Sequence, residues 1–97
     1  MITNFKLFES INGYLLCIKE PDKDFYLKLT KGKKYKIYDS SVGTRIKDDK
    51  KQFGRIDYWY IEHMGGVIMY QYAGGILTTA NSIEEFSMRY DIEKFNI

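Results

Sequence analysis

The chain has one cysteine, one histidine and one proline among its 97 residues. A lone cysteine cannot form an internal disulfide, so the sequence predicts a domain held together by its core in a reducing compartment, the cytoplasm. The same counts exclude a metal site of the usual Cys and His spacing. A nucleophilic Cys17–His63 pair would need a third group to orient the histidine, and Cys17 lies in an apolar segment, where free cysteine packs as a small hydrophobe. We therefore expect a protein that is not an enzyme, with no catalytic residues, no metal and no cofactor.

Long apolar runs are also absent. No run approaches the roughly 20 residues needed to cross a bilayer, and residues 1–6 lack the basic stretch that opens a signal peptide. We therefore expect no membrane partner. With 97 residues, 44% of them hydrophobic and 29% charged, the composition is that of one ordinary globular domain over residues 1–97.

Aromatic residues are abundant, with nine Tyr, six Phe and one Trp making up 16% of the chain. Aromatic side chains suit a pleated, half-buried surface and so favour strands. Strand segments are expected at residues 14–19, 25–29, 34–39, 55–63, 67–73 and 76–79, with Gly-Gly turns joining the last three into an antiparallel meander. In residues 34–37, charged and apolar residues alternate, which predicts that Tyr35 and Ile37 point into the core and Lys34 and Lys36 point outward.

Two segments differ from this pattern. Residues 40–54 are polar and basic, and they predict a long loop. Asp48 and Asp49 within it are conceivable Mg²⁺ ligands, but their charge-balanced surroundings favour a solvated loop. Residues 82–97 predict a C-terminal helix and tail, because Ser82 and Glu85 match a capping box at the start of a helix over 82–90. Ile83, Phe86 and Tyr90 share one face of that helix and would cover one side of the sheet.

The central part of the chain resembles a known group of proteins. The run Leu29-Thr30-Lys31-Gly32-Lys33-Lys34-Tyr35-Lys36-Ile37 matches an L-T-x-G-K-x-Y-x-I core, preceded by the strand-ending pair Ile18-Lys19 and followed by Tyr58-Trp59-Tyr60-Ile61-Glu62. This pattern is similar to short proteins of bacteriophages and prophages of low-GC bacteria that form SH3-like barrels. The resemblance implies an SH3-like barrel, and the longer loop over 40–54 and the tail over 82–97 depart from the pattern. With the helix predicted from the capping box, the expected fold is mainly β (α+β), a small five-stranded antiparallel SH3-like barrel or meander with a short C-terminal helix. It also implies a protein directed at the host, such as an inhibitor of a host enzyme or defence system.

The charge is unevenly distributed along the chain. Residues 1–55 hold thirteen Lys and Arg against seven Asp and Glu, whereas residues 56–97 hold two against six. Such asymmetry can mark a basic interaction face, and the simplest alternative is a set of lysines that only solvates the surface. A basic face would bind an acidic protein surface or, alternatively, the phosphates of a nucleic acid, with nearby Tyr26 and Tyr38 stacking on bases.

Large apolar residues on both faces of residues 58–61 suggest a second binding feature. We expect Tyr58 and Tyr60 to enter the core, while Trp59 and Ile61 need cover from the tail helix, a partner or a second copy of the chain. The preferred hypothesis is a non-catalytic, phage-like binding protein that contacts a host protein, and the alternative is a small nucleic-acid-binding module. The predicted partner-binding residues are the basic Lys33, Lys34, Lys36, Arg45 and Lys47 and the aromatic Trp59, Tyr70 and Tyr72.

Overall fold

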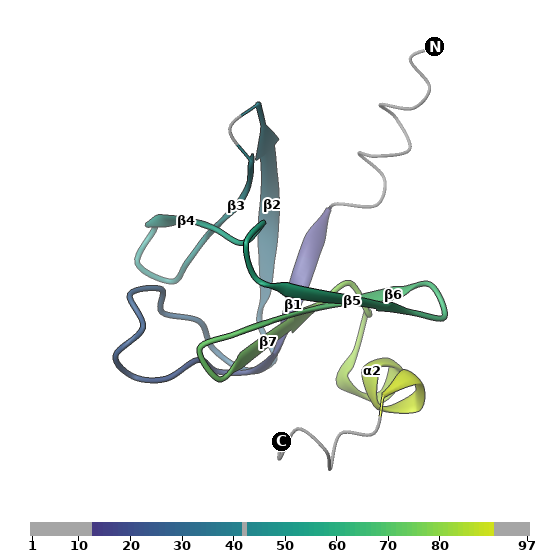
Figure 1. Ribbon diagram of the computed structural model, residues 1–97. Helices are drawn as coiled ribbons and strands as arrows, with labels where there is room; N and C mark the ends of the chain where they lie inside the picture. Colours follow the sequence, from purple (N-terminus) through teal and green to yellow (C-terminus); the bar gives the residue numbers. More distant parts are fainter. Residues whose placement is uncertain (1–12, 42, 91–97) are drawn as a thin grey trace.

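The chain folds around one antiparallel sheet that curls into a half-barrel, as a computed structural model describing residues 13–41 and 43–90 shows (Figure 1). Within these residues there are seven strands, in the spatial order β4-β3-β2-β1-β7-β6-β5, and one short helix. The elements are β1 (Tyr14–Lys19), β2 (Lys34–Ser40), β3 (Gly43–Lys47), β4 (Phe53–Arg55), β5 (Tyr60–Met64), β6 (Val67–Tyr72), β7 (Gly75–Thr78) and α2 (Ile83–Arg89). Figure 1 shows β2 and β3 nearly upright, while β5 and β6 extend nearly horizontally to their right.

Strand β1 lies at the centre of the sheet and is covered on both faces. Its residues Leu15, Leu16, Cys17 and Ile18 are all buried, although successive side chains of a strand point to opposite sides. Leu15 and Cys17 join an inner core within the curl, and Leu16 and Ile18 join an outer core on the other side of the sheet. The continuous apolar run in the sequence therefore reflects two cores that share one strand.

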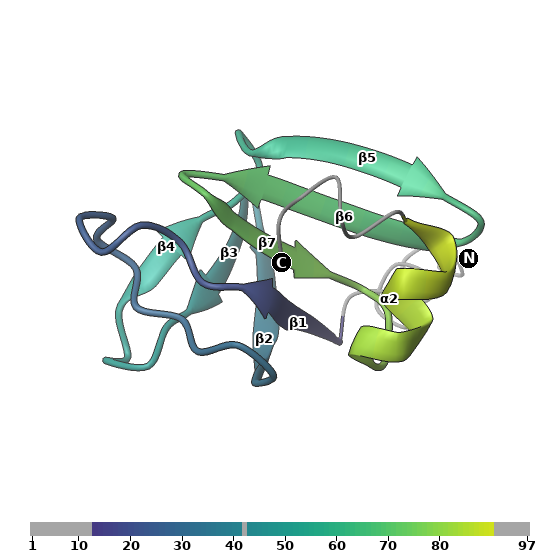
Figure 2. The same cartoon turned by 90° about the horizontal axis from the view of Figure 1, so that it is seen from below.

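The outer core is closed by α2, which packs beside β1 and β6 in Figure 2. Phe86 is fully buried there, and its ring stacks on Tyr90 with 4.8 Å between centroids. The helix begins at Ser82, whose Oγ accepts a hydrogen bond from the backbone N of Glu85, while Glu85 Oε1 accepts one from the backbone N of Asn81. The predicted helix and its buried face are thus confirmed, while residues 91–97 of the predicted tail lie outside the described residues.

The meander of β5, β6 and β7 is also confirmed. The β5–β6 turn places Gly65 and Gly66 at φ 57° and 86°, and Gly74 before β7 has φ 81°. Glycine reaches these positive angles without the steric penalty of other residues, which is why the two Gly-Gly pairs mark the turns.

The prediction of a long loop over residues 40–54 is wrong, because the segment contains strands. Strand β2 extends to Ser40, all of β3 and the start of β4 lie within the segment, and Ile46 is opposite Ile37 while Gly54 is part of the ladder. Only Ile46 and Gly54 point from these two strands into the molecule and are buried. With only one buried residue in each strand, the sequence shows no alternation of apolar and polar residues from which these strands could be predicted. The sheet consequently has seven strands in the described part of the chain rather than the predicted five, while the mainly β class holds.

The segment 25–29 is the opposite case, because the expected strand is an irregular loop between β1 and β2. Its alternation is real, since Leu27 and Leu29 are buried in the inner core while Tyr26 and Lys28 are exposed. The loop packs so closely on β4 that a Cβ at Gly54 would come within 2.5 Å of Leu27. Alternating burial here follows from a loop covering the core, without strand pairing.

Candidate binding surfaces

The outward side of β2, β3 and β4 carries a basic face. Since Tyr35, Ile37 and Ile46 are buried in the inner core, the residues between them point the other way. The strand register aligns Tyr38 with Arg45, Arg45 with Arg55, and Lys47 with Phe53. The basic face is defined here as Lys34, Lys36, Tyr38, Arg45, Lys47, Phe53 and Arg55.

Cations and rings alternate on the basic face. The Arg45 guanidinium lies 4.5 Å and Lys47 Nζ 5.0 Å from the centroid of the Phe53 ring, and Lys36 Nζ lies 5.5 Å from that of Tyr38. The rings of Tyr38 and Phe53 meet edge to face at 5.1 Å. Each cation–ring contact stabilises by roughly 0.5–1 kcal/mol at an exposed site, so these contacts offset part of the repulsion between the neighbouring positive charges.

Most of these cations have no acidic partner within residues 13–41 and 43–90. The ion pairs among the described residues are Arg55–Asp57, at 3.0 Å, and Lys33–Asp49, at 2.8 Å. Arg55 at the edge is therefore neutralised, whereas Lys34, Lys36 and Lys47 on the face belong to neither pair. The structure thus leaves a positive surface spread over two neighbouring strands.

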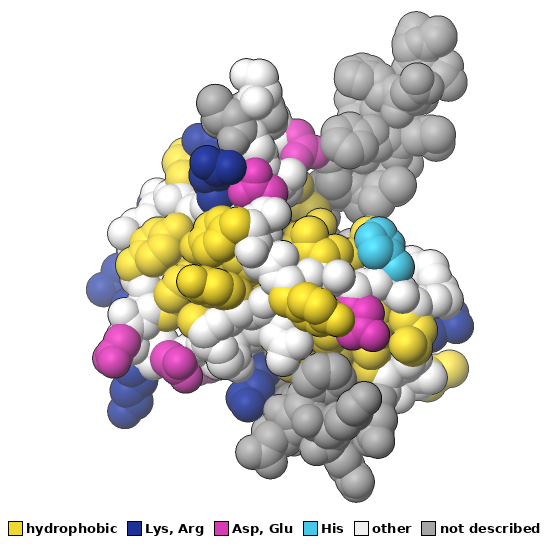
Figure 3. All heavy atoms as spheres, in the orientation of Figure 1, with side chains coloured by type: hydrophobic (Ala, Val, Ile, Leu, Met, Phe, Trp, Pro, Cys, Tyr) yellow, Lys and Arg dark blue, Asp and Glu magenta, His cyan; other side chains and the backbone are white. Residues whose placement is uncertain are grey.

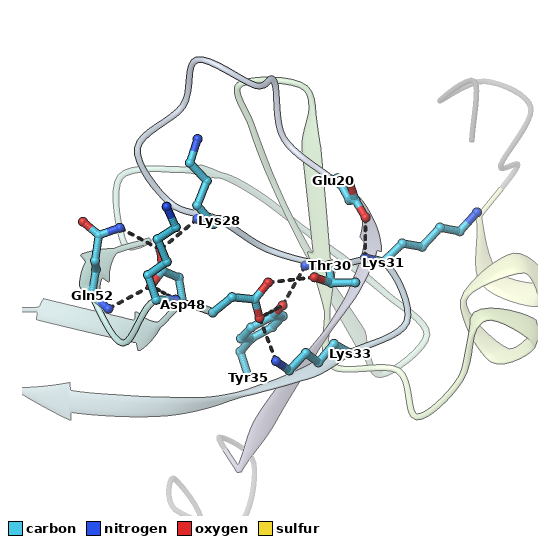
Figure 4. Close-up of polar contacts among 10 residues, drawn as sticks. Glu20, Lys28, Thr30, Lys31, Lys33, Tyr35, Asp48 and Gln52 are labelled. Carbon is cyan, nitrogen blue, oxygen red and sulfur yellow. Dashed lines mark hydrogen bonds and ion pairs between the residues drawn. The ribbon is translucent and has the colours of Figure 1, made fainter.

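Lys33 is the predicted basic residue that does not join the face. It lies just before β2, its Nζ is paired with Asp49, and its charge sits 5.7 Å from the Tyr35 ring. Tyr35 Oη and Thr30 Oγ1 also donate hydrogen bonds to the Asp49 carboxylate, and these side chains converge in Figure 4. Burial opposes ionisation, but the hydrogen bonds from Lys33, Thr30 and Tyr35 hold the pKa of Asp49 below its usual value. Lys33 therefore ties the loop before β2 to the β3–β4 turn.

Asp48 builds the turn that presents β4. Its carboxylate is buried, with 4% exposure, and accepts backbone hydrogen bonds from Lys28, Lys50 and Gln52 at 2.8–2.9 Å (Figure 4). Burial opposes ionisation, yet these donors lower the pKa of Asp48. The side chain predicted as solvated is thus a structural anchor, and its oxygens are already engaged by N–H donors rather than open to Mg²⁺.

A second surface is aromatic. Its rings are Phe25, Tyr26, Tyr58 and Tyr72, which cluster over Trp59 with neighbouring centroids 5.0–6.0 Å apart. Tyr26, Tyr58 and Tyr72 are 43–50% exposed. We name these four residues the aromatic surface, and Figure 3 shows hydrophobic side chains gathered on the side of the molecule where β4 and the β1–β2 loop lie.

The predicted aromatic anchors separate in the structure. Trp59 is only 3% exposed and belongs to the inner core, so the prediction that it anchors a partner at the surface is wrong. Tyr70 is half-buried against the same core, and Tyr72 alone of the three is exposed. Tyr58 and Tyr60 were expected inside, yet both are exposed. The reason is a turn at residues 56–59, closed by a 3.0 Å hydrogen bond from Trp59 N to Ile56 O, which reverses the expected faces.

Sequence reasoning missed Phe53 and Phe25 as surface residues. The sequence predicts a loop at Phe53, and the pairing of Phe53 with Lys47 depends on a strand register that local sequence does not encode. At Phe25 the sequence predicts a strand, whereas the structure has a loop. A usable signal was the recurrence of aromatics beside charged residues at both places, in Asp24-Phe25-Tyr26 and in Phe53-Gly54-Arg55.

The two residues considered for nucleophilic chemistry lie far apart in the sheet. Cys17 is buried in β1, and burial raises the pKa of its thiol to about 12. His63 is exposed on β5, and β7 and β6 lie between the two strands. Over residues 13–41 and 43–90, no group of three or more His, Cys, Asp and Glu side chains could hold a metal ion. In the same ranges no helix has the length and apolar character to span a membrane.

Comparison with known proteins gives no match to any family model, any curated protein or any solved structure.

Proposed function

We propose that the chain is a non-catalytic binding protein whose basic face docks on an acidic surface of another protein. The observation that carries the proposal is the row of cations on β2 and β3, which lie against aromatic rings and form no ion pair with the carboxylates that the structure describes. A patch of one sign raises the rate of encounter with an oppositely charged partner and selects against partners of like charge. Burying Phe53 and Tyr38 at such a contact would add apolar area at its centre.

The arrangement of the rings favours a protein over a nucleic acid. Arg45 and Lys47 lie over Phe53, and Lys36 lies over Tyr38. A base that stacks on these rings would first have to displace the chain's own cations. Carboxylates of a protein partner could instead bind the cations in their present positions, without displacing them from the rings.

A single-stranded nucleic acid is the second candidate. Phe53 is 43% exposed and is flanked by cations on the outward side of β2, β3 and β4, which is the combination of stacking and charge that single strands require. An Arg45 guanidinium can itself stack on a base. The two candidates use the same residues and differ in their dependence on salt.

The resemblance to short phage proteins supports a host protein as the partner and inhibition of a host enzyme or defence system as the outcome. The same resemblance supports the proposal that this curled sheet is related to the SH3-like barrel. We place the encounter in the host cytoplasm, because the lone Cys17 is buried as a thiol and suits a reducing compartment. A homodimer remains a competing use of the exposed aromatic residues.

The test compares the native chain with a variant that carries Lys36→Glu and Lys47→Glu. Both are immobilised and exposed to a nuclease-treated lysate of a low-GC bacterium. The native chain should retain a defined protein that the variant loses by at least about tenfold, because each reversal places like charges opposite each other. Lys31→Glu, an exposed lysine off the basic face, is the matched control and should retain the protein fully.

A fluorescent oligothymidylate serves as the second probe. Weak binding that disappears at moderate salt agrees with non-specific attraction. Tight binding that is lost in the double variant and kept in the control would overturn the protein partner in favour of the nucleic acid. Equal retention of lysate proteins by the native chain and the double variant would remove the basic face as the binding site.

A further inference from the structure

A shallow depression of about 330 Å³ lies beside the aromatic surface, away from the basic face. It is lined by Asp22, Asp24, Phe25, Tyr72 and Ala73. Asp22 N donates to Ala73 O at 2.8 Å and Phe25 N donates to Asp22 O at 3.0 Å, so the β1–β2 loop is tied to the β6–β7 hairpin at this point. The backbone therefore holds both walls of the depression in place before any partner arrives.

The two rings of the depression are fixed by the core beneath them. Tyr72 stacks on the buried Trp59 with 5.9 Å between centroids and meets Phe25 at 5.7 Å. In contrast with the basic face, no cation of the described residues lies over either ring, because the four cation–ring contacts involve Tyr35, Tyr38 and Phe53.

The two carboxylates of the depression are exposed. Neither Asp22 nor Asp24 forms an ion pair within the described part of the chain. The nearby Lys23 and Lys28 line a neighbouring depression that shares Asp22 with this one, and Lys28 Nζ is bound to the carbonyl oxygens of Lys23 and Phe25. Negative charge and open aromatic surface thus coincide at one place.

We propose that this depression binds an arginine side chain from an extended segment of a partner protein. A planar guanidinium lies flat on aromatic rings while its N–H groups donate in pairs to a carboxylate, so one side chain satisfies both walls. Lysine meets the charge requirement but lacks the flat surface. The proposal is independent of the basic face, which selects a partner of the opposite charge.

The experiment is a titration of the isotope-labelled full chain followed by amide chemical shifts. The first probe is a short capped peptide that carries a single arginine. The second is the same peptide with citrulline, which keeps the planar shape and removes the charge. The arginine peptide should shift the amides of Asp22, Asp24, Phe25, Tyr72 and Ala73 together, and the citrulline peptide should bind about fivefold more weakly or worse.

A variant with Asp22→Asn and Asp24→Asn should reduce the affinity for the arginine peptide to that of the citrulline peptide. Glu84→Gln, an exposed carboxylate on α2, is the matched control and should leave the affinity unchanged. The citrulline comparison needs no variant, so it tests the proposal even if the double variant does not fold.

Three results would overturn the proposal. One is equal binding of the two peptides, and another is a set of shifted amides that avoids the depression. The third is the detection of a dimer of the native chain by sedimentation, provided that the double variant is monomeric and that the arginine peptide dissociates the dimer. In that case the occupant is a second copy of the chain and not a partner protein.

Discussion

The basic face and the aromatic surface contain the same kinds of residue, and they relate to the core in opposite ways. On the basic face, the rings of Tyr38 and Phe53 lie outside the sheet and serve as supports for cations. On the aromatic surface, the rings of Phe25 and Tyr72 rest on Trp59, which is itself part of the inner core. The comparison teaches that exposed rings can be either an addition to a fold or the outer layer of its core. Substitutions should therefore affect stability at one surface and mainly binding at the other.

The largest effect is expected for Trp59→Ala. Removing a fully buried large ring leaves a cavity beneath Phe25 and Tyr72 and should lower the free energy of unfolding by about 3–5 kcal/mol. Urea denaturation followed by circular dichroism measures it, with Trp59→Phe as the milder control. A Trp59→Ala variant as stable as the native chain would break the comparison, since Trp59 would then not belong to the core. The same substitution cannot serve as a test of partner contact.

A smaller effect is expected for Asp48→Asn. The amide would place an N–H donor against the backbone N–H of either Lys28 or Gln52, because both carboxylate oxygens now accept hydrogen bonds. The loss should be about 1–3 kcal/mol. The folded pKa of Asp48 is lowered, so its stabilisation is present above the unfolded value of about 4 and is lost as pH falls through the folded value.

Unfolding measured between neutral and acidic pH should therefore show a weaker acid destabilisation in Asp48→Asn than in the native chain. If the free energy of unfolding depended on pH in the same way in the two proteins, the hydrogen bonds to Asp48 would not stabilise its ionised form. Asp24→Asn, on an exposed carboxylate that forms no ion pair among the described residues, is the matched control and should change stability by no more than about 0.5 kcal/mol.

Tyr72→Ala should cost about 1 kcal/mol, because the ring is half exposed and loses its contacts with Trp59, Phe25 and Tyr58. Thermal unfolding of the variant beside Tyr60→Ala, an exposed ring on β5, separates ring contacts from general surface effects. Equal losses in the two variants would mean that the aromatic surface adds nothing to the core.

The smallest change in stability is expected for the charge reversals on the basic face. Lys36→Glu with Lys47→Glu should alter the free energy of unfolding by about 0.5–1 kcal/mol or less, because exposed cation–ring contacts are weak. Denaturant unfolding of the variant beside the native chain measures this. A loss as large as that of Trp59→Ala would show that the basic face is also part of the fold and would end the distinction between the two surfaces.

Local signals were sufficient for part of the fold. The helix from Ile83 to Arg89 was readable because Ser82 and Glu85 cap it within a single turn. The Gly-Gly turns were readable because glycine adopts the positive φ angles of Gly65, Gly66 and Gly74 without steric penalty, although Ala73 beside the second pair also has a φ of 52°. Features that depend on contacts distant in the sequence could not be predicted. Strands β3 and β4 bury only one residue each, and the outward position of Phe53 follows only from the pairing of these two strands.

Composition and local patterns were enough to predict the mainly β class, the capped helix, the two glycine turns and the uneven distribution of charge. Each depends on interactions within a few residues or on composition alone. Only the tertiary structure decided that Lys33 is bound by Asp49 while Lys36, Arg45 and Lys47 stand together, and that Trp59 is inside while Tyr58 is outside. The physical reason is that successive side chains of a strand point to opposite faces, so a shift of one residue exchanges the buried and the exposed set. The turn before β5 and the pairing of β3 with β4 decide which set meets the core, and neither can be predicted from the local sequence.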